Sequence, residues 1–165
     1  MEFQLSTILR AVHILTAALW LGAAALLTLY IMPSIRSAGA AGGSVVAESM
    51  RRGLGAFMAS VAGTTILSGA WLYWIRYQML GASGMHSTGG IVLTLGALAG
   101  FVAMMIGGAV LGRISRELGE LAGAPANETT QARIAALHRR GAAASKVTLT
   151  LLIVALLLMV FSRSF

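Results

Sequence analysis

An arginine and a histidine lie one helical turn apart in an otherwise apolar stretch, STILRAVHILTAALWLG, residues 6–22. On a helix Arg10 and His13 share a face, and Trp20 lies further along near the same stripe. An ionisable side chain inside a membrane-spanning helix is costly and is by default a hypothesis for a functional site. Arg10 is the weaker member of this set, because its long side chain can extend to the lipid headgroups.

Four chemical roles are open for His13. A neutral imidazole can bond to a hydroxyl or carbonyl group of a neighbouring helix. It can also be an axial ligand of haem b, with Arg10 pairing a propionate one turn nearer the surface. Binding of copper or another metal is a third role, and a proton-relay or catalytic role is a fourth.

Haem ligation by two side chains of one chain needs a second ligand, and the other predicted spans contain no histidine. His86 lies in a predicted outer loop and reaches the site only if that loop dips inward. Met159, in the outer half of the last span, is an alternative ligand, for which packing is the simpler explanation. A symmetric dimer that pairs two copies of His13, or five-coordinate iron, would also satisfy the metal. His138 belongs to the opposite end of the bundle.

The composition identifies a membrane protein. Hydrophobic residues make up 58% of the 165 positions and charged residues only 10%, whereas a soluble domain has roughly 25% charged residues. Four stretches can cross a hydrocarbon core that needs about 20 apolar residues of helix. The predicted spans are about 5–31, 53–77, 89–112 and 144–162. Residues 1–165 are therefore predicted to form one transmembrane domain, an all-α, up-down four-helix bundle.

Several local signals predict where the helices begin and end. Pro33 is predicted to end the first helix, and SAGAAGGS (37–44) to form a flexible link. A helix is predicted to begin near Asn127 and to run into the fourth span. The third helix is predicted to extend beyond the bilayer, supported by i,i+4 pairs such as Arg113 with Glu117.

The distribution of basic residues predicts the orientation in the membrane. Nine basic residues lie in the two connections that share one side: Arg36, Arg51, Arg52, Arg113, Arg116, Arg133, Arg139, Arg140 and Lys146. Three lie on the other side: Arg10, Arg76 and Arg163. Positively charged loops stay in the cytoplasm, so both termini are predicted to lie on the outer side of the membrane. The membrane is predicted to be the bacterial inner membrane. The net charge of +7 is explained by these loops, and the expected partner is the lipid bilayer rather than nucleic acid.

Small residues recur at helical spacing in two spans. Gly96, Gly100, Gly108 and Gly112 form one such stripe, and Gly55, Ala59 and Gly63 form another. Close packing of helices in lipid is the simpler explanation, and room for a flat porphyrin ring is the alternative. The chain has no cysteine, which excludes thiolate metal sites and iron–sulfur clusters. A conventional enzyme is not expected, because the spans contain no carboxylate and no nucleophile–base pair.

The first span resembles a known family. RAVHILTAALWLGAAALLTLYIMPSIR (10–36), in which Trp20 and Gly22 follow His13, is similar to the first helix of the copper-resistance-D-like (CopD-like) membrane proteins. GTTILSGAWLY (63–73) and the basic lead-in to the last span share this resemblance. The resemblance implies an inner-membrane four-helix bundle with haem, copper or redox roles, and only His13 carries over as a ligand.

A weaker similarity links the chain to the HemJ-type protoporphyrinogen oxidases, which share the histidine–tryptophan–glycine pattern. This chain has STGGIVLTLG (87–96) where that group would have a histidine–lysine pair. The expected function is therefore haem b binding through His13, for electron transfer or within a redox assembly. The alternatives are a non-catalytic structural or assembly subunit, as a homodimer or in a larger membrane complex, and a copper-handling protein.

Overall fold

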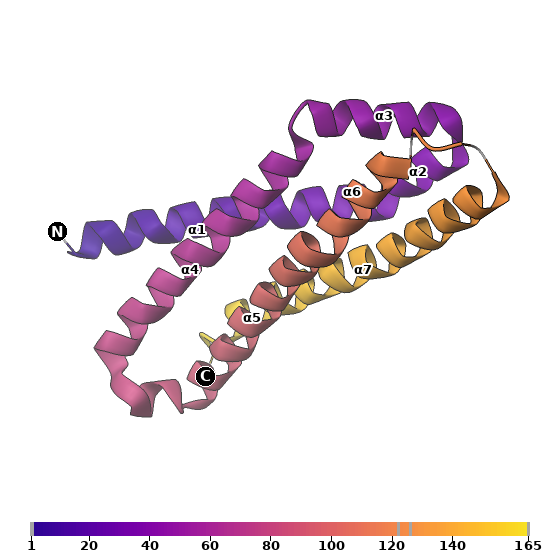
Figure 1. The fold of residues 1–165 in the computed structure, drawn as a ribbon. Coiled ribbons are helices and arrows are strands. Elements are labelled where there is room, and N and C mark those ends of the chain that lie inside the picture. The colour runs from indigo at the N-terminus through magenta and orange to yellow at the C-terminus, as the bar shows by residue number, and fades with distance from the viewer. Residues whose placement is uncertain (1, 122, 126, 165) are drawn as a thin grey trace.

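The computed structural model describes residues 2–121, 123–125 and 127–164, in which every regular element is a helix (Figure 1). Four helical stretches are long and apolar enough to cross a membrane: Gln4–Ser37, Leu54–Met85, Thr88–Leu121 and Glu128–Phe161. The predicted all-α, four-helix membrane fold is confirmed. Each stretch is longer than the predicted span because the helices continue beyond the apolar residues.

The first span does not end at Pro33. It consists of α1 (Glu2–Leu26), a π-helical turn η1 (Leu27–Ile31) and α2 (Met32–Ser37). Proline has no N–H to donate to the carbonyl four residues earlier, and the wide turn before it absorbs that defect. The helix therefore continues through Pro33, and the predicted end at this residue is wrong.

The predicted flexible link at 37–44 is also mostly helical. After a turn at Gly39, where φ is 58°, helix α3 (Ala40–Arg51) runs back beside α2. A Cβ atom on Gly42 would collide with the carbonyl oxygen of Ile35, so glycine permits this close approach. The predicted link is thus a tight turn followed by a helix.

The second and third spans are joined by a short turn at residues 86–87. Helix α4 (Leu54–Met85) is kinked at Gly81, where φ is 65°. Helix α5 (Thr88–Met105) begins after Ser87, whose hydroxyl accepts a hydrogen bond from the N–H of Gly90 at 3.2 Å. A second π-helical turn, η2 (Ile106–Leu111), leads into α6 (Gly112–Leu121). The predicted extension of the third helix is confirmed.

The fourth span is one long helix, α7 (Glu128–Phe161). Asn127 caps it by accepting a hydrogen bond from the N–H of Thr130 at 2.8 Å, so the predicted start near Asn127 is confirmed. The predicted pairing of Glu117 with Arg113 is not observed. Glu117 instead accepts a hydrogen bond from Nε of Arg133 at 2.6 Å, because α7 packs against α6.

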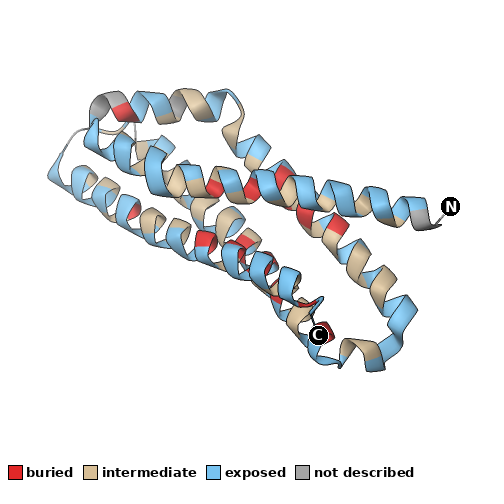
Figure 2. Cartoon of the chain, turned by 180° about the vertical axis from the view of Figure 1, so that it is seen from behind, coloured by how far each residue is buried: buried red, intermediate tan, exposed pale blue. Residues whose placement is uncertain are grey.

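The helices associate mainly as two antiparallel pairs, α1 with α4 and α5 with α7 (Figure 1). The buried residues gather near the middle, where these pairs meet (Figure 2). This core consists of Trp20, Ala24, Val61, Ala62, Ala103 and Leu152. Most other apolar side chains are exposed on the outside of the bundle, as expected of surfaces that face lipid.

Only part of the predicted glycine stripe of the third span packs against another helix. Gly96 and Gly100 are buried, and a Cβ atom on Gly96 would lie 3.2 Å from the carbonyl oxygen of Ala155. A Cβ atom on Gly108 or Gly112 would meet nothing within 4 Å. The π turn rotates the residues that follow Met105 about the helix axis, so one continuous stripe no longer faces α7.

Candidate functional site

His13 lies where α1 packs against α4. Its Nδ1 atom is 2.9 Å from the backbone carbonyl oxygen of Thr65. A carbonyl oxygen can only accept a hydrogen bond, so Nδ1 carries a proton and donates it. In the neutral imidazole the other nitrogen, Nε2, then holds the free lone pair.

Hydroxyl groups surround this hydrogen bond. Ser68 Oγ lies 3.3 Å from Nδ1 of His13 and donates to the carbonyl of Thr64 at 2.6 Å. Thr65 Oγ1 donates to Thr16 Oγ1 at 2.8 Å. Thr65 and Ser68 are each only 6% exposed. We call His13, Thr16, Thr65 and Ser68 the α1–α4 polar cluster. Its part-buried hydrogen bonds fix where the imidazole sits.

Gly69 gives the imidazole room against the backbone of α4. A Cβ atom at this position would lie 2.8 Å from Cε1 of His13 and 3.1 Å from Nδ1, but 3.7 Å from Nε2. The first of these distances is shorter than real Cβ contacts allow. The ring therefore sits directly on the helix, and Nε2 is the ring nitrogen further from it.

Arg10 and Trp20 lie in different surroundings from His13. At about 100° per residue, Trp20 is rotated roughly 20° from His13 about the helix axis, and Arg10 roughly 60°. Trp20 is accordingly 5% exposed and belongs to the core. Arg10 is exposed and forms no ion pair among the described residues. It remains free to pair with an external anion.

The two other predicted ligands do not meet His13. His86 is exposed and lines a cavity of about 260 Å³ with Tyr73, Met85, Ile91, Thr94 and Leu95. Met159 packs against α5, where its Cγ atom lies 3.2 Å from the Cβ position of Gly96. None of the contacts resolved in the described part of the chain joins either residue to His13. The same residues contain no group of three or more His, Cys, Asp or Glu that could hold a metal ion.

The residues that position His13 were not singled out from the sequence. Thr65, Ser68 and Gly69 come from the segment GTTILSG of the second span. Two hydroxyl residues three positions apart in an apolar helix share one face, so their spacing was a usable signal. The partner helix was not predictable, because four similar spans can be paired in several ways.

A second polar contact lies nearer the turn between α4 and α5. Tyr73 Oη is 2.9 Å from Thr94 Oγ1 and joins α4 to α5. Close to it in sequence, Nε of Arg76 is buried and has no hydrogen-bond partner among the described residues. This contact ties the two helix pairs together, and it involves no metal-binding side chain.

The α1–α4 polar cluster can present one neutral imidazole nitrogen, held in a fixed tautomer, to a metal or a proton. Arg10 adds an unpaired positive charge one turn nearer the N-terminus. Comparison with protein-family models, curated proteins and solved structures finds no match to this chain.

Proposed function

We propose that this chain binds haem b through Nε2 of His13 and serves electron transfer within a redox assembly of the bacterial inner membrane. The observation that supports this most is the 2.9 Å hydrogen bond between Nδ1 of His13 and the Thr65 carbonyl oxygen. A histidine that binds a metal usually donates its other ring N–H to a carbonyl or carboxylate. That bond orients the ring and makes the ligating nitrogen more basic.

The surrounding residues fit one side of such a site. Gly69 lets the imidazole lie against α4, and the α1–α4 polar cluster holds the ring in place. Arg10 is available to pair with a propionate, because it forms no ion pair with another described residue. Bound haem would supply reversible one-electron chemistry, and this chain would supply the ligand, its orientation and a balancing charge.

In this proposal the second axial ligand of the haem iron does not come from the same chain. His86 lies in the turn between α4 and α5, Met159 lies on α7, and neither makes a described contact with His13. A second copy of the chain, or a different subunit, would therefore supply the second axial ligand. If neither does, the iron would be five-coordinate. The proposal thus includes a homodimer or a larger membrane complex.

The proposal is tested by the absorption spectrum of protein purified from haem-replete cells. We expect a Soret band that shifts on reduction and that is lost in His13→Ala. His13→Asn is the matched variant, since it keeps an N–H donor for the Thr65 carbonyl but removes the imidazole ligand. It should fold and still lack the band. Arg10→Ala should weaken haem retention by about 1–3 kcal/mol. A colourless, well-folded wild-type protein would contradict the proposal.

A structural or assembly subunit is the second candidate, favoured by the unused small-residue face of α4. A Cβ atom on Gly63 would meet nothing within 4 Å, and Ala59 is exposed. Small residues let helices of different chains approach closely in lipid. In this case Gly63→Leu should break up an oligomer seen by crosslinking, while the wild-type protein carries no haem.

A further inference from the structure

A cavity of about 350 Å³ lies between α2 and α7, away from His13. It is lined by Arg36 of α2 and by His138, Arg139, Ala142, Ala143 and Lys146 of α7. The five α7 residues are spaced one, four, five and eight positions along the helix and therefore share one face. The two alanines leave the space open, and the longer side chains surround it with positive charge.

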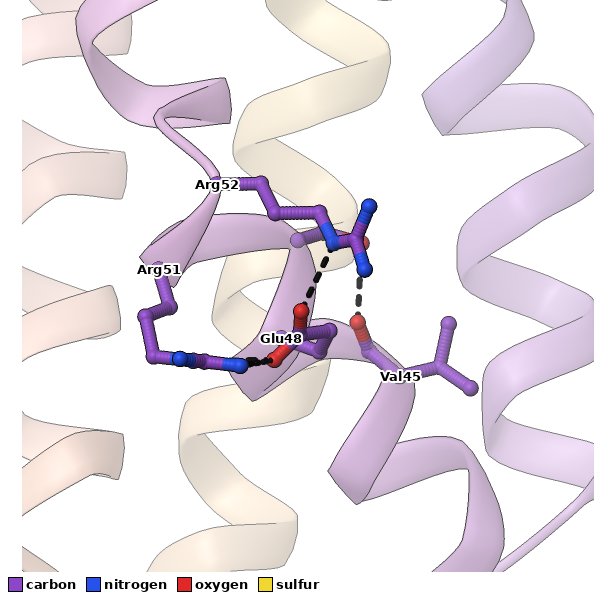
Figure 3. A network of polar contacts seen from close by, with 5 residues as sticks. Val45, Glu48, Arg51 and Arg52 are labelled. Atoms are coloured by element: carbon purple, nitrogen blue, oxygen red, sulfur yellow. Dashed lines mark hydrogen bonds and ion pairs between the residues drawn. The ribbon is translucent and has the colours of Figure 1, made fainter.

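The positive charge of this cavity is not balanced by the chain. No acidic residue lines the cavity. Arg36, Arg139 and Lys146 form no ion pair with any described residue. Two acids of other helices are already engaged: Glu48 of α3 binds Arg51 and Arg52 (Figure 3), and Glu117 of α6 binds Arg133. An anion entering the cavity would therefore meet three unpaired cationic groups.

The cavity lies where two spans leave the apolar core of the membrane. Arg36 follows the apolar residues of the first span, and Lys146 directly precedes residues 147–161 of α7, which are apolar apart from Thr148 and Thr150. Those fifteen residues extend roughly 22 Å at about 1.5 Å each, so the backbone of Lys146 lies within about 8 Å of one edge of a hydrocarbon core of about 30 Å. The long side chain of Lys146 covers this remaining distance to the headgroups, and Arg139 lies about two turns further out. The cationic groups thus lie at the depth of lipid headgroups.

We propose that this cavity binds the phosphate group of an anionic phospholipid. Guanidinium groups bind phosphate oxygens through paired, charge-assisted hydrogen bonds, and an ammonium group adds a point charge. Basic pockets between membrane helices on the cytoplasmic side are suited to such headgroups. The acyl chains would lie along the exposed apolar surface below. This site is independent of His13 and of haem.

Lipid retention measured by native mass spectrometry tests the proposal. The full chain is released from nanodiscs of phosphatidylcholine and phosphatidylglycerol, and the bound lipids are counted. We expect the wild-type protein to retain phosphatidylglycerol preferentially. Arg36→Gln and Arg139→Gln should each lower that preference about five-fold. Arg140→Gln is the matched control, because its charge is next in sequence but outside the cavity, and it should change nothing.

Ala143→Leu gives a test that leaves the charge intact. It should fill the cavity and lower phosphatidylglycerol retention while circular dichroism shows unchanged helicity. Equal losses in Arg139→Gln and Arg140→Gln would indicate diffuse surface attraction and overturn the proposed site. Adding sodium phosphate to the nanodiscs distinguishes the two sources of phosphate. Release of phosphatidylglycerol by inorganic phosphate, but not by equal ionic strength of sodium chloride, would assign the cavity to free phosphate and overturn the lipid assignment.

Discussion

The two helix pairs are held together by different means. The α1–α4 pair carries the polar cluster, in which His13 and Thr16 bond to Thr65 of the other helix. The α5–α7 pair packs through small residues, with Gly96 against Ala155. None of the side-chain hydrogen bonds resolved in the described residues crosses from α5 to α7. One pair thus places an ionisable group at its interface, and the other is apolar there.

This difference supports the proposal that places the chemistry in the α1–α4 pair. Between membrane helices the hydrophobic effect contributes little, so close packing of small residues is enough to join α5 and α7. A histidine at such an interface adds cost, which its hydrogen bond to α4 offsets, and the proposed haem ligation would give a second reason for its presence in α1. We take α5–α7 as the supporting half and α1–α4 as the functional half.

The largest effect is expected from a bulky side chain in the supporting half. Gly96→Leu should lower the free energy of unfolding by about 3 kcal/mol, because even a Cβ atom there lies 3.2 Å from Ala155, Leu158 and Met159 of α7. The matched control is Gly108→Leu, where the Cβ position is open. Detergent titration followed by circular dichroism measures both. Equal destabilisation would show that tight packing at Gly96 does not join the pair.

A smaller effect is expected from a methyl group beneath the imidazole. Gly69→Ala should destabilise the protein by about 1–2 kcal/mol and should displace His13, because the new Cβ atom would lie 2.8 Å from Cε1. Gly63→Ala, on the same helix, meets nothing within 4 Å and should be neutral. If haem is bound, only Gly69→Ala should also lower its retention. Identical behaviour of the two variants would remove Gly69 from the account.

Two threonine-to-valine changes compare a buried hydroxyl group that forms a hydrogen bond between helices with one that does not. Thr65→Val removes the hydroxyl that bonds to Thr16 and should cost about 1 kcal/mol. Thr148 of α7 is also buried, but its Oγ1 has no hydrogen-bond partner in the described part of the chain. Thr148→Val should therefore be neutral or slightly stabilising. The same detergent titration measures both, and a large loss in Thr148→Val would contradict the apolar character of α5–α7.

The smallest effect is expected at the exposed end of α3, outside both pairs. Hydrogen bonds from Arg52, and to a smaller extent from Arg51, lower the pKa of Glu48 below its ordinary value (Figure 3). Because this pKa is lowered in the folded state, the ionised carboxylate stabilises the folded state at pH values above the unfolded pKa of about 4.3. This stabilisation is lost as the pH falls through the folded-state pKa. The protection factors of the α3 amides, which correct for the intrinsic pH dependence of hydrogen exchange, should therefore fall slightly in acid, and less so in Glu48→Gln. No such difference would show that the network is fully screened.

Most of the fold was predictable from the sequence. Apolar stretches of about the right length gave the four spans, and Asn127 gave the start of α7 by its capping side chain. The errors lie where a local rule was overridden. Pro33 does not end its helix, because a π turn precedes it, and residues 40–51 form α3 despite Gly42 and Gly43.

The candidate site was predictable only in part. His13 stood out because an ionisable residue in an apolar span is unusual. Its partners Thr65 and Gly69 lie more than fifty positions away, and their role depends on which spans pack together. Arg10 and Trp20 seemed to share a stripe with His13, but a rotation of roughly 60° gives Arg10 different neighbours.

The tautomer of His13 and its response to haem test the central claim most directly. The chain has three histidines, so ¹⁵N-labelled imidazoles can be assigned by comparing wild-type protein with His86→Gln and His138→Gln. We predict that, without haem, Nδ1 of His13 is protonated and Nε2 is not. Added ferric haem should then broaden the Nε2 resonance of His13 alone. A protonated Nε2, or a spectrum unchanged by haem, would contradict the account and leave His13 as a purely structural link between α1 and α4.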